Sequence, residues 1–307
     1  MICTLCPRNC KAERAEETGA GVCRIGERAV FVPGTIVGEE WDVRIVRSTS
    51  AAVWGRGETL RSPSPHRAEP DCPAYPRCGG CALRHMDYEE ELSLKLQRVN
   101  DALHRIGKLD FSVSGILPAP EDARQRRKVI FNVAEQNGRP VAGFYRARSH
   151  EVVPVPDCPA VPKEALTCAQ TVLDWMEREH IPVYDEAAKR DGVRHIFYRS
   201  SHLTEKAVLT LTASLSPGEK ALGILTDMLR ERCPDVTGLV LNRNTARGNT
   251  VLAGEFDTVW GSEVLTEGLC GLTFTLSPRS FFQVNPPQAE RLYEAALGYA
   301  GITPGMA

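Results

Sequence analysis

The alternation of apolar and polar positions predicts a β-rich first part of the chain. Residues 29–34 and 40–46 have the pattern of strands, and turns are expected at Pro33-Gly34 and at Gly55-Arg56-Gly57. Glycine and proline at these points suit tight connections between strands. We therefore predict a small β module over residues 24–68.

The remainder of the chain mixes helical and strand patterns. Apolar residues recur at spacings of four and three from Leu92 to Ile106, which places them on one face of a helix over residues 88–107. A turn at residues 136–138 joins strands 128–134 and 140–145 into a hairpin. The same reasoning predicts helices at 162–181 and 219–232, and strands at 192–199, 208–212 and 238–242. The predicted fold class is α+β.

Cysteine spacing indicates a metal or cluster site. Cys72, Cys78 and Cys81 lie within ten residues of one another, in a segment whose prolines and glycines suit a loop. A tetrahedral zinc ion or an iron–sulfur cluster needs four ligands, and spacing alone does not choose between the two. Cys158 is the best fourth ligand, because it shares the Asp-Cys-Pro context of Cys72.

A second cysteine group opens the chain. Cys3, Cys6, Cys10 and Cys23 could hold another cluster or a zinc ion. The opening Cys-x2-Cys-Pro-Arg-x-Cys resembles the head of glycyl-radical activating enzymes of the radical S-adenosylmethionine class. No radical Cys-x3-Cys-x2-Cys motif follows, so no activity is inferred from this resemblance.

Composition describes an ordinary globular protein, whereas local charge points to nucleic acid. The chain of 307 residues is 42% hydrophobic with a net charge of −2, and it lacks a signal peptide or membrane span, so we expect a cytoplasmic protein without an obligate protein partner. Residues 124–150 hold seven basic side chains against Glu135, and seven minus one leaves +6. A basic hairpin can neutralise phosphates, which indicates RNA binding, and the alternative is that the charges alternate onto opposite faces and only keep the sheet soluble. The basic residues are Arg124, Arg126, Arg127, Lys128, Arg139, Arg146 and Arg148.

Three motifs together resemble the RNA uracil-5-methyltransferases of bacteria. They are Cys72-x5-Cys78-Gly79-Gly80-Cys81-Ala82-Leu83-Arg84-His85, Arg126-Arg127-Lys128-Val129-Ile130-Phe131, and Ser280-Phe281-Phe282-Gln283-Val284-Asn285. The resemblance spans residues 21–304 and implies methyl transfer from S-adenosylmethionine to C5 of a uridine in ribosomal or transfer RNA. It also implies a 4Fe–4S cluster on Cys72, Cys78, Cys81 and Cys158.

The resemblance assigns roles to individual residues as well. Gln283 is expected near S-adenosylmethionine, and Phe281 near the target base, where an aromatic ring can stack on an extruded uracil. Arg126 and Lys128 are expected to contact the RNA. The family has tyrosine where Gln125 stands, which is a departure from its pattern.

The expected domain order follows the same resemblance. Residues 1–23 form a cysteine-rich head, and residues 24–68 resemble the TRAM module, an OB-like barrel. The head displaces the opening strand of this barrel, so we expect an incomplete barrel. A central cluster and RNA-binding domain follows over residues 69–275, and residues 276–307 begin a Rossmann-like methyltransferase domain.

The chemistry of the family needs groups that residues 1–307 lack. A thiolate must add to C6 of uracil, a base must remove the C5 proton, and a Gly-rich loop must hold the cofactor. We therefore expect the front part of such an enzyme, inactive by itself. The alternative is a non-catalytic iron–sulfur protein that binds RNA. A third hypothesis, radical chemistry at the N-terminal cysteines, requires a second, reducible cluster.

Overall fold

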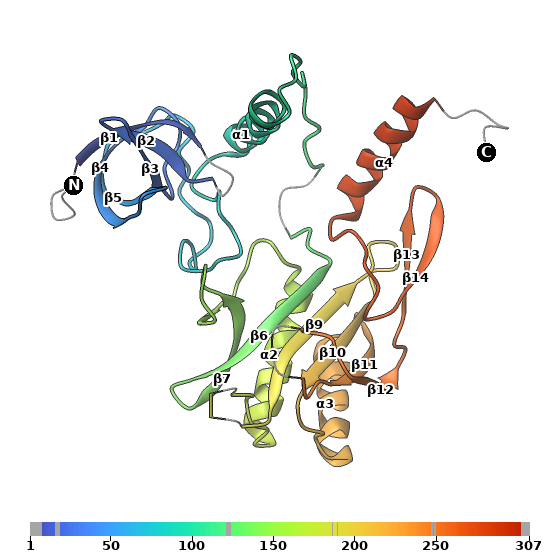
Figure 1. The fold of residues 1–307 in the computed structure, drawn as a ribbon. Helices are drawn as coiled ribbons and strands as arrows, with labels where there is room; N and C mark the ends of the chain where they lie inside the picture. The colour runs from blue at the N-terminus through green and yellow to red at the C-terminus, as the bar shows by residue number, and fades with distance from the viewer. Residues whose placement is uncertain are drawn as a thin grey trace. The chain divides into compact units, whose positions relative to one another are not determined.

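The computed structural model describes residues 8–15, 19–120, 124–185, 187–188, 190–246, 248 and 250–301, except for the side chains of residues 8, 9 and 14. It divides into two compact units (Figure 1). The barrel unit comprises Met1–Pro76 and Cys81–Pro118, and the sheet unit comprises Arg77–Gly80 and Ala119–Ala307. The predicted boundary near residue 69 differs from this division, because residues 81–118 group with the barrel.

Five strands close the barrel in the order β1-β2-β3-β5-β4. They are β1 (Arg8–Ala15), β2 (Gly21–Ile25), β3 (Arg28–Val32), β4 (Glu40–Ser48) and β5 (Val53–Ser62). The expectation of an incomplete barrel is therefore corrected. The first strand comes from the predicted cysteine-rich head, since β1 pairs with both β2 and β4 and closes the wall.

Two cysteines of the predicted second metal site lie inside this barrel. Cys10 and Cys23 are buried in its core beside Val30 and Val43. A hydrogen bond with Cys10, and then burial, raise the pKa of Cys23 far above its ordinary value, which keeps its thiol protonated. Both residues therefore act as small packed hydrophobes in the described structure. Cys3 and Cys6 lie outside the described residues.

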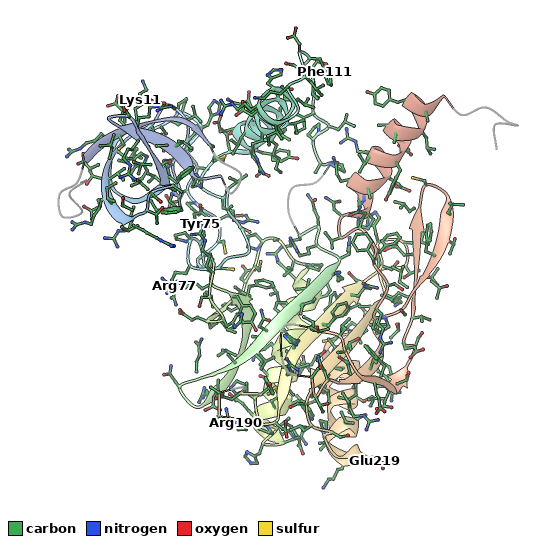
Figure 2. All side chains as sticks on the ribbon, in the orientation of Figure 1. Lys11, Tyr75, Arg77, Phe111, Arg190 and Glu219 are labelled. Atoms are coloured by element: carbon green, nitrogen blue, oxygen red, sulfur yellow. The ribbon has the colours of Figure 1, made fainter. Side chains whose placement is uncertain are left out.

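Helix α1 (Tyr88–Asp101) continues into a π-helical turn (Ala102–Ile106), which agrees with the predicted extent of the helix. The predicted apolar face is only partly buried. Leu94 packs in the cluster with Ile36 and Met86, whereas the exposed fraction is 48% for Val99 and 79% for Ile106. The chain after the helix also carries exposed apolar side chains, such as Phe111 (Figure 2). Periodicity therefore located the helix but not the face that it buries.

A buried carboxylate connects the barrel to the segment that leaves it. Glu39 accepts hydrogen bonds from the backbone N–H groups of Ile36 (2.9 Å) and Ser64 (3.1 Å) and from Trp41 Nε1 (2.9 Å). Arg67 donates to both of its carboxylate oxygens, at 2.6 and 2.7 Å. Burial alone would raise the pKa of Glu39, but these donors outweigh it and lower that pKa to about 2.

A seven-stranded sheet with the order β12-β11-β10-β9-β6-β7-β8 forms the body of the sheet unit. Its strands are β6 (Lys128–Gln136), β7 (Arg139–Tyr145), β8 (Val152–Pro154), β9 (Val193–Ser200), β10 (Ala207–Ala213), β11 (Val236–Arg243) and β12 (Glu255–Gly261). The predicted hairpin is confirmed as β6 and β7, with Asn137 and Gly138 both at positive φ in the turn.

Two helices cover one face of this sheet (Figure 1). They are α2 (Lys163–Arg178) and α3 (Glu219–Arg232), which confirm the predicted helices, and Trp175 Nε1 of α2 donates to Ala221 O of α3 at 2.7 Å. Tyr198 lies on the helix side, where it interacts with Cys168 of α2. Since successive residues of a strand face opposite sides, Arg199 lies on the other face.

A short hairpin and a last helix complete the sheet unit. Strands β13 (Leu265–Leu269) and β14 (Leu272–Leu276) pack on the sheet through Leu265 and Leu276, which contact Val208 and Val240. Helix α4 (Pro286–Ala300) begins at Asn285, whose side chain accepts from Gln288 N. Among the helices of the described residues, none combines the length and the apolar character that crossing a bilayer requires.

Replacing Glu39 with glutamine should destabilise the barrel by about 3 kcal/mol at neutral pH. The pKa of Glu39 falls from 4.5 to about 2 on folding, so its contribution is fully present above pH 4.5 and disappears as the pH falls through 2. Hydrogen–deuterium exchange of the barrel amides at several pH values measures this loss. Glu27→Gln, at an exposed turn of the same barrel, is the control, and equal exchange in the two variants at pH 7 would contradict the prediction.

Candidate nucleic-acid interface

The segment that leads from β14 to α4 is clamped by a buried arginine. Arg199 Nη1 donates to Ser277 O at 2.7 Å, and its Nη2 donates to Ser280 O at 2.6 Å. Burial lowers the pKa of Arg199 from its ordinary value, and the two carbonyl oxygens each accept a hydrogen bond from the guanidinium in this buried position. The clamp fixes the backbone that precedes the Phe281 motif.

A second set of hydrogen bonds joins this segment to the start of β6. Arg127 N donates to Val284 O at 2.9 Å, and Ser200 N donates to Arg127 O at 2.9 Å. Asn285 Nδ2 also donates to Gln125 Oε1. The structure therefore brings together two of the predicted motifs, which lie about 150 residues apart in the sequence. We call residues 125–128, Arg199 and residues 277–285 the clamp region.

The two phenylalanines of the motif point in different directions. Phe282 packs against Phe274, with ring centroids 5.7 Å apart, and against the cluster that contains Val208 and Val240. Phe281 is 79% exposed. Exposure of an aromatic ring to water is unfavourable. An exposed ring on a fixed backbone can therefore be used to stack against a bound partner. Gln283 is half-buried on the same segment.

The clamp region carries positive charge. Lys128 stands directly opposite Arg199 in the β6–β9 register. Burial, and then repulsion from Arg199 and Arg126, lower the pKa of Lys128 from 10.5. Among the described residues, no acidic side chain forms an ion pair with Arg126 or Lys128. An anion placed here would relieve the repulsion.

Part of the predicted basic charge is neutralised elsewhere. Arg124 pairs with Asp157 at 3.1 Å, and Arg146 pairs with Glu151 at 3.1 Å. Both arginines therefore have structural roles around the loops that follow β7 and β8. Arg139 is exposed at the hairpin turn. None of the described acidic residues forms an ion pair with the other five basic side chains, of which Arg126, Arg127 and Lys128 lie in the clamp region and Arg139 and Arg148 lie outside it.

The four cysteines predicted as cluster ligands divide between the two units. Cys72 and Cys81 belong to the barrel unit, where the Arg84 guanidinium forms a hydrogen bond with the Cys81 sulfur. Cys78 and Cys158 belong to the sheet unit. Within the part of the chain that the structure describes, no group of three or more Cys, His, Asp and Glu side chains is arranged to hold a metal ion.

The sheet unit holds Cys78 through close backbone packing. Gly79 N donates to Tyr145 O at 2.9 Å, and Cys78 forms a β-bridge with Arg146. A Cβ atom at Gly79 would lie only 2.7 Å from Tyr145 O, so this position requires glycine. Gly80 N donates to the Cys78 sulfur at 3.4 Å. Donors aimed at sulfur atoms suit thiolates that carry negative charge, as metal ligands do.

Sequence reasoning found the motif residues of the clamp region but missed the contacts that anchor them. Arg199 ends an otherwise apolar stretch, Ile196-Phe197-Tyr198, and a buried guanidinium is costly unless it is fully hydrogen-bonded. An arginine at the end of an apolar strand pattern was therefore the signal that could have identified Arg199. The bond between Gln125 and Asn285 had no local signal, because its partners are far apart in the sequence.

Comparison with known proteins gives relatives that are longer than this chain. An uncharacterized RNA methyltransferase of Clostridium tetani is 33% identical over 287 residues, which cover 92% of this chain and 62% of that protein. One of Bacillus cereus is 34% identical over 288 residues, with the same coverage. The chain thus spans about 62% of the length of these curated relatives. No family model matches the chain.

The fold has a counterpart among solved structures. It matches the crystal structure of Pyrococcus abyssi tRNA (uracil-54, C5)-methyltransferase in complex with S-adenosyl-L-homocysteine, with a TM-score of 0.72 and 20% identity. The match covers 94% of this chain and 64% of that chain. The barrel and the mixed α/β sheet unit therefore have the fold of the corresponding part of that protein. The match shows the fold, and the relatives are described as RNA methyltransferases.

Replacing Arg199 with lysine should loosen the clamped segment, because one ammonium group cannot reach both carbonyl oxygens in the geometry of the guanidinium fork. We expect amide hydrogen exchange in residues 277–284 to become about tenfold faster. Peptide-level mass spectrometry measures the change. Arg178→Lys, which alters an exposed ion pair with Glu179 on α2, serves as the control, and similar exchange in both variants would argue against the clamp.

Proposed function

We propose that this chain is the RNA-binding front part of an S-adenosylmethionine-dependent RNA uracil-C5 methyltransferase. The observation that carries the proposal is the clamp region, where Phe281 is exposed on a fixed backbone and where none of the described acidic residues forms an ion pair with Arg126 or Lys128. The relatives described as RNA methyltransferases and the fold match support the same assignment.

Phe281 provides the contact to the base. C5 of a uridine is reached only when the nucleotide leaves its stack, and the extruded base then needs an apolar surface in place of its former neighbours. An aromatic ring that is exposed before RNA binds can take that place without rearrangement of the protein. Stacking of this kind contributes about 1–3 kcal/mol per base.

Arg126 and Lys128 provide the contacts to the backbone of the RNA. Arg126 is exposed, and Lys128 lies beside Arg199, so the local field is positive before any phosphate arrives. A phosphate that approaches Lys128 offsets its repulsion from Arg199 and stabilises its charged form. These contacts position the RNA, whereas Phe281 contacts the base itself.

Gln283 is the residue of this chain that would contact S-adenosylmethionine. The cofactor supplies the electrophilic methyl group when it is bound. The amide of Gln283 can both donate and accept hydrogen bonds, and its half-buried position two residues after Phe281 limits its mobility. The clamp would then keep the base contact and the cofactor contact on one rigid segment.

We also propose a 4Fe–4S cluster held by Cys72, Cys78, Cys81 and Cys158. Its support is the family resemblance of the cysteine motif and the donors that reach two of the sulfur atoms, from Arg84 to Cys81 and from Gly80 N to Cys78. Hydrogen bonds to the sulfur ligands stabilise the negative charge of such a cluster. The cluster would tie the cysteine loop to the chain that follows β8.

Replacing Phe281 with alanine should lower the affinity for RNA about tenfold without changing its dependence on salt, because stacking involves no counterion. Lys128→Gln should instead reduce the slope of log affinity against log salt concentration by about 0.7. Fluorescence anisotropy with a labelled RNA hairpin that has a uridine in its loop measures both effects.

The matched control is Tyr299→Ala, which removes another highly exposed aromatic side chain, on α4. We expect it to leave the affinity unchanged. If Phe281→Ala and Tyr299→Ala bind the RNA hairpin as tightly as the unchanged chain does, the proposed role of the clamp region is wrong.

Cys72→Ser should remove most of the iron from protein purified without oxygen, since a cluster of four irons requires its cysteine ligands. We expect about four irons and four sulfides per chain before the change. Chemical analysis of both elements provides the measurement. Cys270→Ser, at the β13–β14 turn, should keep its iron, and equal iron contents in the two variants would rule out the proposed ligand set.

A further inference from the structure

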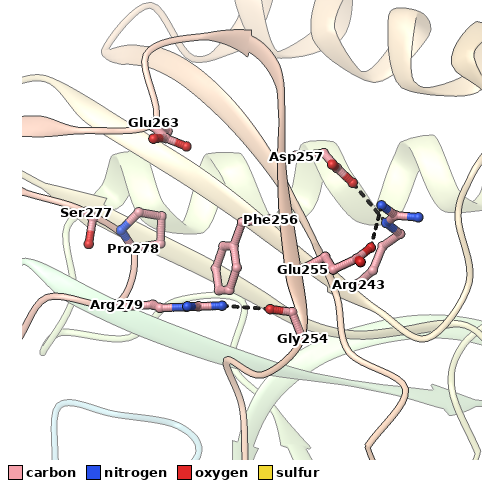
Figure 3. A pocket seen from close by; sticks show the side chains of 9 residues that line it. All are labelled: Arg243, Gly254, Glu255, Phe256, Asp257, Glu263, Ser277, Pro278 and Arg279. Atoms are coloured by element: carbon pink, nitrogen blue, oxygen red, sulfur yellow. Dashed lines mark hydrogen bonds and ion pairs between the residues drawn. The ribbon is translucent and has the colours of Figure 1, made fainter.

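A cavity of about 610 Å³ lies in the sheet unit beside the edge strand β12 (Figure 3). Its volume is within the range of sites that bind small organic ligands. It shares Ser277, Pro278 and Arg279 with the clamp region. The residues that line it are Arg243, Gly254, Glu255, Phe256, Asp257, Glu263, Ser277, Pro278 and Arg279.

An arginine stacked on an aromatic ring forms one side of this cavity. The guanidinium carbon of Arg279 lies 4.2 Å from the ring centroid of Phe256, and its Nη2 donates to Gly254 O at 2.7 Å. Figure 3 shows the guanidinium beneath the Phe256 ring, with a hydrogen bond to the Gly254 carbonyl. Gly254 has a φ of +78°, and a Cβ atom there would lie 2.2 Å from Arg243 O. The exposed guanidinium of Arg279 is therefore held in a fixed orientation.

Three carboxylates also line the cavity. Arg243 pairs with Glu255 at 2.7 Å and with Asp257 at 2.9 Å, so these two acids share one cation. Glu263 differs from them, since none of the described basic residues forms an ion pair with it. Thr258 Oγ1 donates to Glu263 Oε2 at 3.1 Å, which orients the carboxylate. The cavity thus combines a planar stacking surface with an oriented hydrogen-bond acceptor.

This combination selects among possible ligands. Three carboxylates against two arginines disfavour a phosphate group in the cavity itself. A guanidinium plane that rests on Phe256 can stack against a nucleobase. A carboxylate accepts two parallel hydrogen bonds most readily from neighbouring N–H groups, which the N1 and N2 atoms of guanine provide. Uracil has one N–H donor on the corresponding edge, and adenine has only its amino group.

We propose that this cavity binds a guanine base of the RNA, stacked on Arg279 and hydrogen-bonded to Glu263. The proposal rests on the proposed function, because it places a second base of the same RNA on the segment that carries Phe281. Arg279 and Phe281 are two residues apart, and Arg199 fixes the backbone on either side of Arg279 by holding Ser277 O and Ser280 O. A guanine close to the target uridine would then set the register of the RNA.

The test compares single-stranded RNA pentamers that differ at one position. The complete chain is titrated with labelled pentamers that contain uridine together with guanosine, inosine or adenosine, and anisotropy is measured at constant salt. Inosine lacks only the N2 amino group of guanosine. We expect guanosine to be preferred to inosine about tenfold, as a bidentate contact requires. Glu263→Gln should abolish the preference, and Arg279→Ala should weaken binding of all three pentamers.

The control and a separate titration distinguish the possible outcomes. Arg230→Ala removes another guanidinium that stacks on an aromatic ring, 4.7 Å from the centroid of Trp260 and outside the cavity, and it should preserve the preference for guanosine. Guanosine monophosphate alone should bind at least tenfold more weakly than the guanosine pentamer. Mononucleotide binding as tight as that of the pentamer would identify a free-nucleotide site and overturn the proposal.

The two hypotheses fail in different ways. If the pentamers bind and Phe281→Ala weakens them, but guanosine and inosine bind equally or Glu263→Gln keeps the preference, the guanine site is wrong while the proposed function stands. If no pentamer and no RNA hairpin binds, the proposed function fails and the guanine site fails with it.

Discussion

The arrangement of the sheet unit depends on a buried guanidinium that holds backbone carbonyl groups. Arg199 lies on a central strand, and its two donors reach Ser277 O and Ser280 O at 2.7 and 2.6 Å. A buried cation without hydrogen-bond acceptors is unfavourable. Movement of the segment away from Arg199 would therefore raise the free energy of the folded state. The positions of Arg279, Phe281 and Gln283 depend on Arg199, because these residues belong to the segment that it holds.

The two sides of that anchored segment have opposite electrostatic character. Near the start of β6, Arg126 and Lys128 add to the charge of Arg199, and the described residues provide no acid against them. Beside β12, Glu255, Asp257 and Glu263 outnumber the two arginines of the cavity. Such a division suits a polyanion that carries its charge on the backbone and its hydrogen-bond donors on the bases. The phosphates and the base edges would be drawn to different sides of one short segment.

Sequence patterns located most of the regular elements, and long-range contacts account for what they missed. The hairpin of β6 and β7 and the helices α2 and α3 follow from local periodicity and turn chemistry, and all were predicted close to their observed bounds. The buried face of α1 was not, because Leu94 packs on Ile36, a residue of the barrel about sixty positions earlier. The barrel is closed by β1, whose partners β2 and β4 the N-terminal cysteine spacing does not reveal. In the clamp region, the motif residues were predicted, but their anchors Arg199 and Gln125 required the fold.

The pairing of Lys128 with Arg199 across two strands has a thermodynamic consequence. Two positive charges directly opposite each other on paired strands repel and destabilise the folded state. Neutral side chains at these positions would remove that repulsion. A bound polyanion would reduce that repulsion, so its binding would also stabilise the folded state. Selection for higher affinity for nucleic acid would favour a cation at Lys128. Selection for higher stability of the unbound protein would favour a neutral side chain there.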